Sequence, residues 1–178
     1  DHSARFYLRM TVADKPGVGD VWTWMIGGRD AGMAHGFIQD LADRLANRIQ
    51  LTTDGHKVYI EAVEAAFGSE IDYSMLVKIY GAERPGEARY SPAKCIGTIK
   101  ECCGGSPDPA HVSTSYVERQ NLTMRMSMRR FTRLTNAFSK KVQNLEAAVA
   151  LHFMYYNFCR IHQSLRVTPA MEAGVAQR

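Results

Sequence analysis

The chain has 178 residues, of which 46% are hydrophobic and 22% charged, a balance that indicates one globular domain with a real core. No apolar run approaches the roughly 18 residues that a membrane span needs, and the opening DHSARFYLRM lacks the apolar core of a signal peptide. The net charge of +4 is concentrated, because seven Lys or Arg residues and a single acid, Glu118, lie between His111 and Lys141.

The apolar pattern of the first half predicts an α/β order of strand, strand, helix, strand, helix, strand. The expected elements are strands over 5–12 and 20–26, a helix over 34–46, a strand from 48 to Asp54, a helix from about Lys57 and a strand over 72–81. In the second strand, Trp22 and Trp24 alternate with Val21 and Thr23, so we expect both indoles on one face, pointing into the core.

The second half is expected to begin with a long irregular insertion and to end in helices. Residues 81–111 hold four of the six prolines and five of the fourteen glycines, and only 94–99 has a strand-like pattern. Helices are predicted over 115–129 and over 142–162, the latter with an apolar face. The four cysteines follow no zinc-ligand spacing, so we expect free thiols in a reducing, cytosolic protein.

A basic block of this kind indicates a polyanionic partner, of which nucleic acid is the commonest, and a solvated basic face is the alternative. Asp54 ends a predicted buried strand, where reactive groups of α/β sheets collect, although an Asp before Gly55 is also a common turn former. Glu118 heads the basic helix and could approach Asp54 across the sheet. Convergent carboxylates beside Arg and Lys suit a two-metal phosphoryl-transfer site.

Three segments in order carry a family resemblance: LTTDGHKVYIEAVEAAFG, TSYVERQNLTMRMSMRRFTRLTNAFSKK and YNFCRIHQSLRVTPAMEAG. Together they resemble the DDE-type transposases of bacterial insertion sequences, in particular the insertion-sequence-one type. The match runs from about Gly27 to the C-terminus. TDG alone is a weak signal, whereas TDG, then ERxN, then YN-x2-R-x-H-x2-L-x2-TP in this order is specific.

The resemblance implies a single ribonuclease-H-like domain over 1–178, a mixed sheet flanked by helices with an incomplete N-terminal strand region. It implies Asp1, Asp54 and Glu118 as catalytic, metal-binding acids for two Mg²⁺ or Mn²⁺ ions. The implied activity is DNA transposition, by cleavage and strand transfer on double-stranded transposon ends and target, carried out by a homo-oligomer in a bacterial cytoplasm. The implied DNA-binding residues are Arg119, Asn121, Arg125, Arg129, Arg130, Arg133, Lys140, Arg160 and His162, with packing as the alternative role of His162.

The N-terminal segment departs from the family pattern. Asp1 is the best positional match to the first acid, with Phe6 in the expected place, while Asp20 falls where the family opens its second strand. The residues before Gly27 supply two of the three antiparallel strands of such a sheet. Three hypotheses therefore stay open: a transposase, a non-catalytic DNA-binding remnant of one, and another ribonuclease-H-like nuclease.

Overall fold

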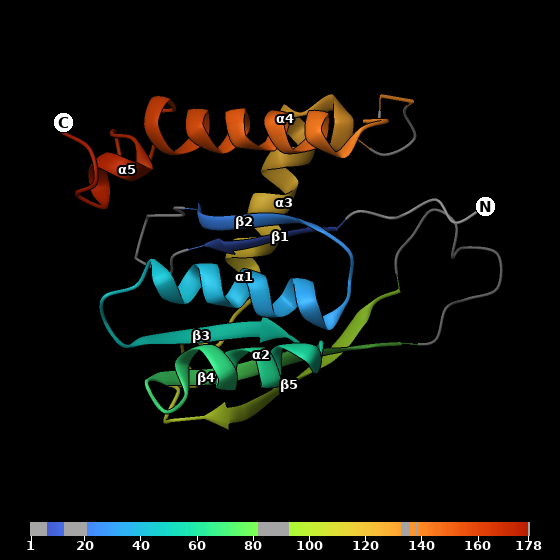
Figure 1. Cartoon of the computed structure of the whole chain (residues 1–178), viewed down its shortest axis with the longest axis vertical. Helices are drawn as coiled ribbons and strands as arrows, with labels where there is room; N and C mark the ends of the chain where they lie inside the picture. The colour runs from blue at the N-terminus through green and yellow to red at the C-terminus, as the bar shows by residue number, and fades with distance from the viewer. Residues whose placement is uncertain (1–6, 13–20, 82–92, 133–135, 138, 178) are drawn as a thin grey trace. The chain divides into compact units, whose positions relative to one another are not determined.

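A computed structural model describes residues 7–12, 21–81, 93–132, 136–137 and 139–177 (Figure 1). The contacts within the chain group it into two compact units. The first unit consists of Asp1–Met33 and Ser115–Arg178, and the second unit of Ala34–Thr114. None of the described helices is long and apolar enough to cross a membrane.

The first unit contains an antiparallel hairpin of β1 (Tyr7–Val12) and β2 (Val21–Gly27), as the sequence predicts. The ladder is regular from the pair Tyr7–Gly27 to the pair Thr11–Thr23, but Val12 then pairs with Val21. Trp22 is therefore an extra residue opposite the Thr11–Val12 step, which is a β-bulge.

This bulge overturns the prediction that both tryptophans point into the core. An extra residue reverses the inside–outside alternation beyond it, so Val21 contributes to the same cluster as Trp24 and Ile26. Trp22 is instead exposed, at 36%. The strand's own alternation could not reveal this, because the bulge depends on pairing with β1.

The helices of the first unit follow the predicted order but end earlier. They are α3 (Ser115–Ser127), a 3₁₀ turn η1 (Arg129–Phe131), α4 (Val142–Met154), a π-helical turn η2 (Tyr155–Cys159) and α5 (Pro169–Glu172). The helix predicted to reach residue 162 thus ends at Cys159. The short α5 begins because Thr168 accepts a hydrogen bond from the backbone N–H of Met171 and Pro169 supplies a helical first position.

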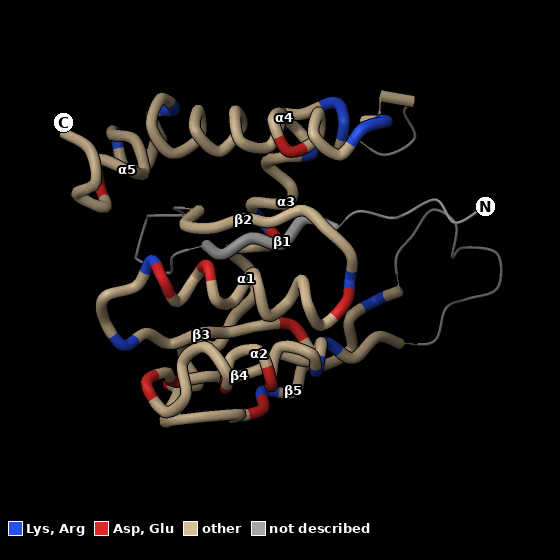
Figure 2. The backbone as a smooth tube through the Cα atoms, in the orientation of Figure 1, with Lys and Arg blue, Asp and Glu red and all other residues tan. Residues whose placement is uncertain are grey.

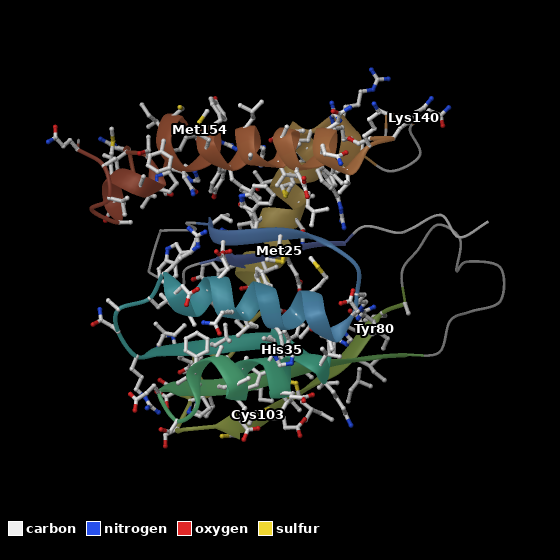
Figure 3. All side chains as sticks on the ribbon, viewed as in Figure 1. Met25, His35, Tyr80, Cys103, Lys140 and Met154 are labelled. Carbon is white, nitrogen blue, oxygen red and sulfur yellow. The ribbon has the colours of Figure 1, made fainter. Side chains whose placement is uncertain are left out.

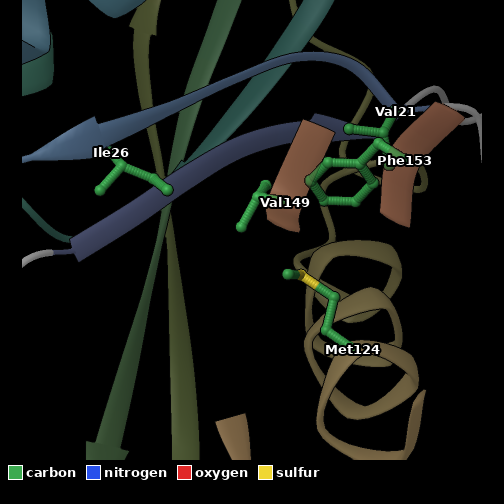
Figure 4. Packing of buried hydrophobic residues seen from close by; sticks show 5 residues of the cluster. All are labelled: Val21, Ile26, Met124, Val149 and Phe153. Carbon is green, nitrogen blue, oxygen red and sulfur yellow. The ribbon is translucent and has the colours of Figure 1, made fainter. Parts of the chain in front are cut away.

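The hydrophobic core of the first unit lies where β2, α3 and α4 meet (Figure 4). Its buried members are Val21, Ile26, Met124, Val149 and Phe153. Trp24 packs against them, with its ring 6.3 Å from that of Phe153 between centroids. The apolar face predicted for the final helix is confirmed, since Val149, Phe153 and Tyr156 are all buried.

The second unit is a mixed three-stranded sheet flanked by helices, so the predicted α/β class is confirmed (Figure 1). The strands β3 (Ile49–Asp54), β4 (Ile71–Tyr80) and β5 (Cys95–Gly104) lie in that order, with β3 parallel to β4 and β5 antiparallel to it. Helix α1 (Ala31–Asp43) buries four residues at helical spacing, and α2 (Val58–Phe67) joins β3 to β4. The α1 residues are Ala34, Phe37, Ile38 and Leu41.

Strand β5 confirms the strand-like pattern expected at 94–99 and extends it to Gly104, so this part of the segment 81–111 is not irregular. It spans ten residues and pairs along β4, from Tyr80–Cys95 to Tyr73–Gly104. The sequence indicated only the first part of this strand, because none of its residues is buried, so no apolar alternation marks its full length, and Gly97 and Gly104 lower its strand propensity. Residues 82–92 of the predicted insertion lie outside the described part.

At the end of the sheet away from Asp54, Arg48 connects the ends of all three strands of this unit. Arg48 binds both carboxylate oxygens of Asp72, at 3.0 and 2.7 Å, and donates to the carbonyls of Ser69 and Ile71. The backbone N–H of Ser106 donates to the same carboxylate at 2.8 Å. The starts of β3 and β4 are thereby tied to the end of β5, and the guanidinium holds the pKa of Asp72 down to about 2.

Candidate functional site

Asp54 is the last residue of β3 and lies, exposed, at the carboxyl end of the parallel β3–β4 pair, opposite Leu76. Its Oδ1 accepts a hydrogen bond from the backbone N–H of His56 at 3.2 Å, so it forms the turn expected of an Asp-Gly pair. The turn runs close to β4, because a Cβ on Gly55 would come 3.0 Å from Val77. Asp54 therefore does form the turn, and in doing so its carboxylate is held exposed at the end of β3.

Side chains of β3, β4 and α2 pack around the base of this turn. Thr53, the residue before Asp54, shares a 2.8 Å hydrogen bond with the hydroxyl of Tyr73, which is only 2% exposed. Burial raises the pKa of Tyr73 to about 12, so its hydroxyl stays protonated at neutral pH. His56 packs edge-on against Tyr59 at 5.8 Å, and its Nε2 is buried without a partner in the described residues. His56 thus packs beside the turn.

Glu118 lies in the first turn of α3, where the helix dipole favours a carboxylate. Gln120 and Met124, one turn apart, are the buried residues of this helix at 3% and 2% exposure, and they set its inward face. Glu118 and Arg119 are exposed. The Nε2 of Gln120 is buried and finds no partner in the described residues, a feature that the sequence did not predict.

Most of the predicted DNA-binding residues are exposed in the first unit. Figure 2 marks the Lys and Arg positions, and Figure 3 labels Lys140 at the start of α4. Arg130 donates to the hydroxyl of Ser139 and, at 3.5 Å, to the carbonyl of Asn144, so it bridges η1 and α4. Asn121 is half-buried. The exposed members are Arg119, Arg125, Arg129, Arg130, Lys140 and Arg160, and Arg133 lies outside the described residues.

His162 takes the packing role that was the alternative to phosphate binding. Its ring meets Tyr156 edge-on at 4.9 Å, and its Nε2 is buried. His152 stacks on the same Tyr156 at 6.4 Å. Burial lowers the pKa of His162, with the charge of Arg160 acting in the same direction, so the ring is neutral at pH 7. A neutral, packed imidazole is a poor phosphate ligand.

Asn157 is a structural residue that sequence reasoning missed. Its Nδ2 donates to the carbonyl of Val21 at 2.9 Å, and its Oδ1 accepts from the N–H of Val21 at 3.4 Å. The π-helical geometry of η2 places this amide against the start of β2. In the YN pair of the C-terminal motif, Tyr156 is thus buried, and Asn157 binds the backbone of Val21, the first residue of β2. Val21 directly follows Asp20 in the sequence.

The predicted set of acids is only partly within the described residues. Asp54 belongs to the second unit and Glu118 to the first, while Asp1 and its alternative Asp20 lie outside the described part. Within the described ranges, no three His, Cys, Asp or Glu residues are grouped closely enough to hold a metal ion.

No family model, curated protein or solved structure matches this chain. The functional interpretation consequently depends on the chemistry of Asp54, Glu118 and the exposed basic residues.

Proposed function

We propose that this chain is the ribonuclease-H-like catalytic region of a DDE-type transposase that cleaves and joins DNA phosphodiesters. The observation that supports this most is the position of Asp54. It is an exposed carboxylate at the carboxyl end of a strand that is parallel-paired to its neighbour, followed by a helix. Open α/β sheets bind their ligands at this edge.

The secondary structure supports the same proposal. An antiparallel hairpin precedes α1, then β3, α2 and β4 form a strand–helix–strand unit, and a helix with an early acid follows. This order is what the ribonuclease-H-like resemblance leads one to expect. Strand β5 is an addition to that order.

The two described acids suit a hard divalent cation. Asp54 and Glu118 are exposed and provide carboxylate oxygens, the ligands that Mg²⁺ prefers. The family resemblance assigns them, with Asp1, to Mg²⁺ or Mn²⁺ ions, which would activate the attacking hydroxyl and stabilise the leaving oxygen. The chain's own contribution is to hold the carboxylates, through the Asp54 turn and the first turn of α3.

The basic residues of α3 and η1 would bind the DNA backbone. Arg119 and Arg125 are exposed on α3, and Arg129 and Arg130 extend the series into η1. Arginine forks suit phosphate oxygens, and such contacts position the duplex without reading its sequence. Lys140 and Arg160 add two further exposed charges in the same unit.

A non-catalytic DNA-binding remnant is the second candidate, and the hairpin favours it. The described residues before α1 form two strands, whereas the fold requires three antiparallel strands there. A missing strand would displace the first acid while leaving the exposed arginines of α3 and η1 unchanged. The two candidates therefore differ in cleavage and agree in DNA binding.

Nicking of supercoiled plasmid DNA in the presence of Mg²⁺ or Mn²⁺ separates the candidates. We expect nicking by the wild-type chain, loss of it in Asp54→Asn and Glu118→Gln, and retention in the control Glu64→Gln, an exposed acid of α2. Nicking that survives both acid substitutions refutes the catalytic assignment. No nicking by a folded wild-type chain that still binds DNA indicates the remnant.

The DNA-binding part has its own test. Replacing Arg125, Arg129 and Arg130 by Ala should flatten the slope of log affinity against log salt by about 0.9 for each phosphate that these arginines neutralise in the wild type. Arg44→Ala is the matched control, since Arg44 is an exposed arginine paired with Asp40 on α1. An unchanged slope in the triple variant refutes phosphate binding by these arginines of α3 and η1.

A further inference from the structure

Helix α4 and the turn η2 leave a row of large apolar and aromatic side chains in water. One face of α4 packs into the core of the first unit through Val149 and Phe153. The row lies at positions outside that face. Its members are Leu151 at 62% exposure, Met154 at 54%, Tyr155 at 57% and Phe158 at 50%, and we call them the outer stripe. A water-facing helix surface is normally polar, so the outer stripe indicates an interaction surface.

The two aromatic members of the outer stripe both lie in η2. Tyr155 is the first residue of this turn, and Phe158 follows three residues later. About half of each side chain is open to a ligand. Exposed aromatic rings stack with nucleobases of any sequence, because every base has a π-face. The outer stripe thus offers two rings on which unpaired bases can stack.

The charge of the surrounding chain fits a polyanion. Between Glu118 and Glu172 the sequence contains nine Lys or Arg residues and a single acid, Glu146, which is half-buried. A polyanion bound there therefore meets many cations and almost no like charge. Single-stranded nucleic acid presents apolar base faces together with phosphates, and its binding sites combine aromatic side chains with positive charge. The outer stripe and its basic surroundings have this combination.

Two exposed arginines follow the outer stripe. The backbone N–H of Arg160 donates to the carbonyl of Tyr155 at 2.9 Å, which holds Arg160 against the end of η2. Within the described part of the chain, its guanidinium is not paired with a carboxylate. Arg166 lies in a tight loop, where its N–H donates to the carbonyl of His162 at 2.7 Å. Its φ of 59° is positive, which is uncommon for arginine, and such strained positions cluster at functional sites.

We propose that the outer stripe binds single-stranded DNA, with unpaired bases stacked on Tyr155 and Phe158 and the phosphates next to Arg160 and Arg166. This inference rests on the proposed function, because an enzyme that cleaves and joins DNA handles strand ends that are no longer fully paired. In a duplex the base faces are already stacked on one another. The outer stripe therefore selects unpaired bases, whereas the arginines of α3 and η1 contact phosphates of either form.

Fluorescence anisotropy with a labelled oligo-dT tests the two rings, in EDTA so that no cleavage occurs. We expect Tyr155→Ala and Phe158→Ala each to weaken binding by about 5- to 150-fold, which corresponds to the loss of one stacked base. Tyr155→Phe keeps a ring and should bind like the wild type. Tyr80→Ala is the matched control and should also bind like the wild type, since Tyr80 is 55% exposed but lies on β4.

Circular dichroism confirms that each variant is folded. A folded double variant, Tyr155→Ala with Phe158→Ala, that keeps wild-type affinity overturns the proposal, as does equal weakening by Tyr80→Ala. Tighter binding of oligo-U than of oligo-dT overturns the choice of DNA.

An abasic oligonucleotide of the same length separates base stacking from phosphate binding. It keeps the phosphates and lacks the bases, so the wild type should bind it about as weakly as the double variant binds oligo-dT. Equal affinity of the wild type for the abasic oligonucleotide and for oligo-dT overturns the proposal and leaves the outer stripe to a partner protein.

The outcome is distinguishable from that of the nicking experiment, which uses duplex plasmid and metal. Nicking together with equal binding of abasic DNA and oligo-dT refutes the stacking surface and leaves the proposed function intact. Ring-dependent binding of oligo-dT by a chain that does not nick supports the stacking surface and refutes the catalytic assignment.

Discussion

The amide of Asn157 provides the sharpest test of how the first unit is held together. It makes two hydrogen bonds to the backbone of Val21, and Val21 is only 5% exposed. Replacing Asn157 by Ala removes both bonds and leaves a buried N–H and C=O at the start of β2 without these partners. We therefore expect a clear loss of stability in the first unit.

The expected size follows from the two distances. The 2.9 Å bond from Nδ2 is of ordinary length and stabilises by about 1 kcal/mol, while the 3.4 Å bond is at the long limit and adds about 0.5 kcal/mol. Leaving the Val21 groups unpaired costs about 1 kcal/mol more. Asn157→Ala should thus lower the free energy of unfolding by about 2–3 kcal/mol, or roughly 4–12 °C in Tm for a chain of this size.

Tryptophan fluorescence during urea unfolding is the assay, because both tryptophans of the chain, Trp22 and Trp24, lie on β2 and report on the first unit. Asn144→Ala is the matched control, since Asn144 is an exposed asparagine on α4 and its substitution should cost less than about 0.5 kcal/mol. Equal midpoints for Asn157→Ala and Asn144→Ala refute the reasoning.

Two further predictions concern the second unit. Asp72→Asn should destabilise it at pH 7, and the gap to wild type should close as the pH falls from about 4, the ordinary pKa of an Asp, to about 2, its folded value. A gap that is independent of pH in urea unfolding contradicts the ion pair with Arg48. Gly105→Ala should destabilise more than Gly68→Ala, although both glycines have positive φ (64° and 53°). Only at Gly105 would a Cβ collide, 2.3 Å from Asp72 Oδ1, and equal thermal shifts would rule out this crowding.

The acids show how far sequence reasoning reached at the candidate site. The position of Asp54 at a strand end, and of Glu118 in the first turn of a basic helix, followed from local patterns and is confirmed. Whether the carboxylates converge is a question of long-range geometry that local patterns do not contain. The packing of His162 against Tyr156 was likewise open in the sequence, because its motif fits a phosphate ligand and a core residue equally well.

The sequence by itself determined the order of strands and helices, since periodic burial is a local property. Helix α1 and strands β3 and β4 begin and end within a few residues of expectation, and α2 begins where it was expected. The tertiary structure decided the features that depend on a neighbour across space. Pairing with β1 created the bulge that turns Trp22 outward, and pairing with β4 extended an exposed segment into β5. Packing against the start of β2 made Asn157 the hydrogen-bond partner of the Val21 backbone, because buried backbone groups need a partner and the tertiary structure decides which side chain is near enough.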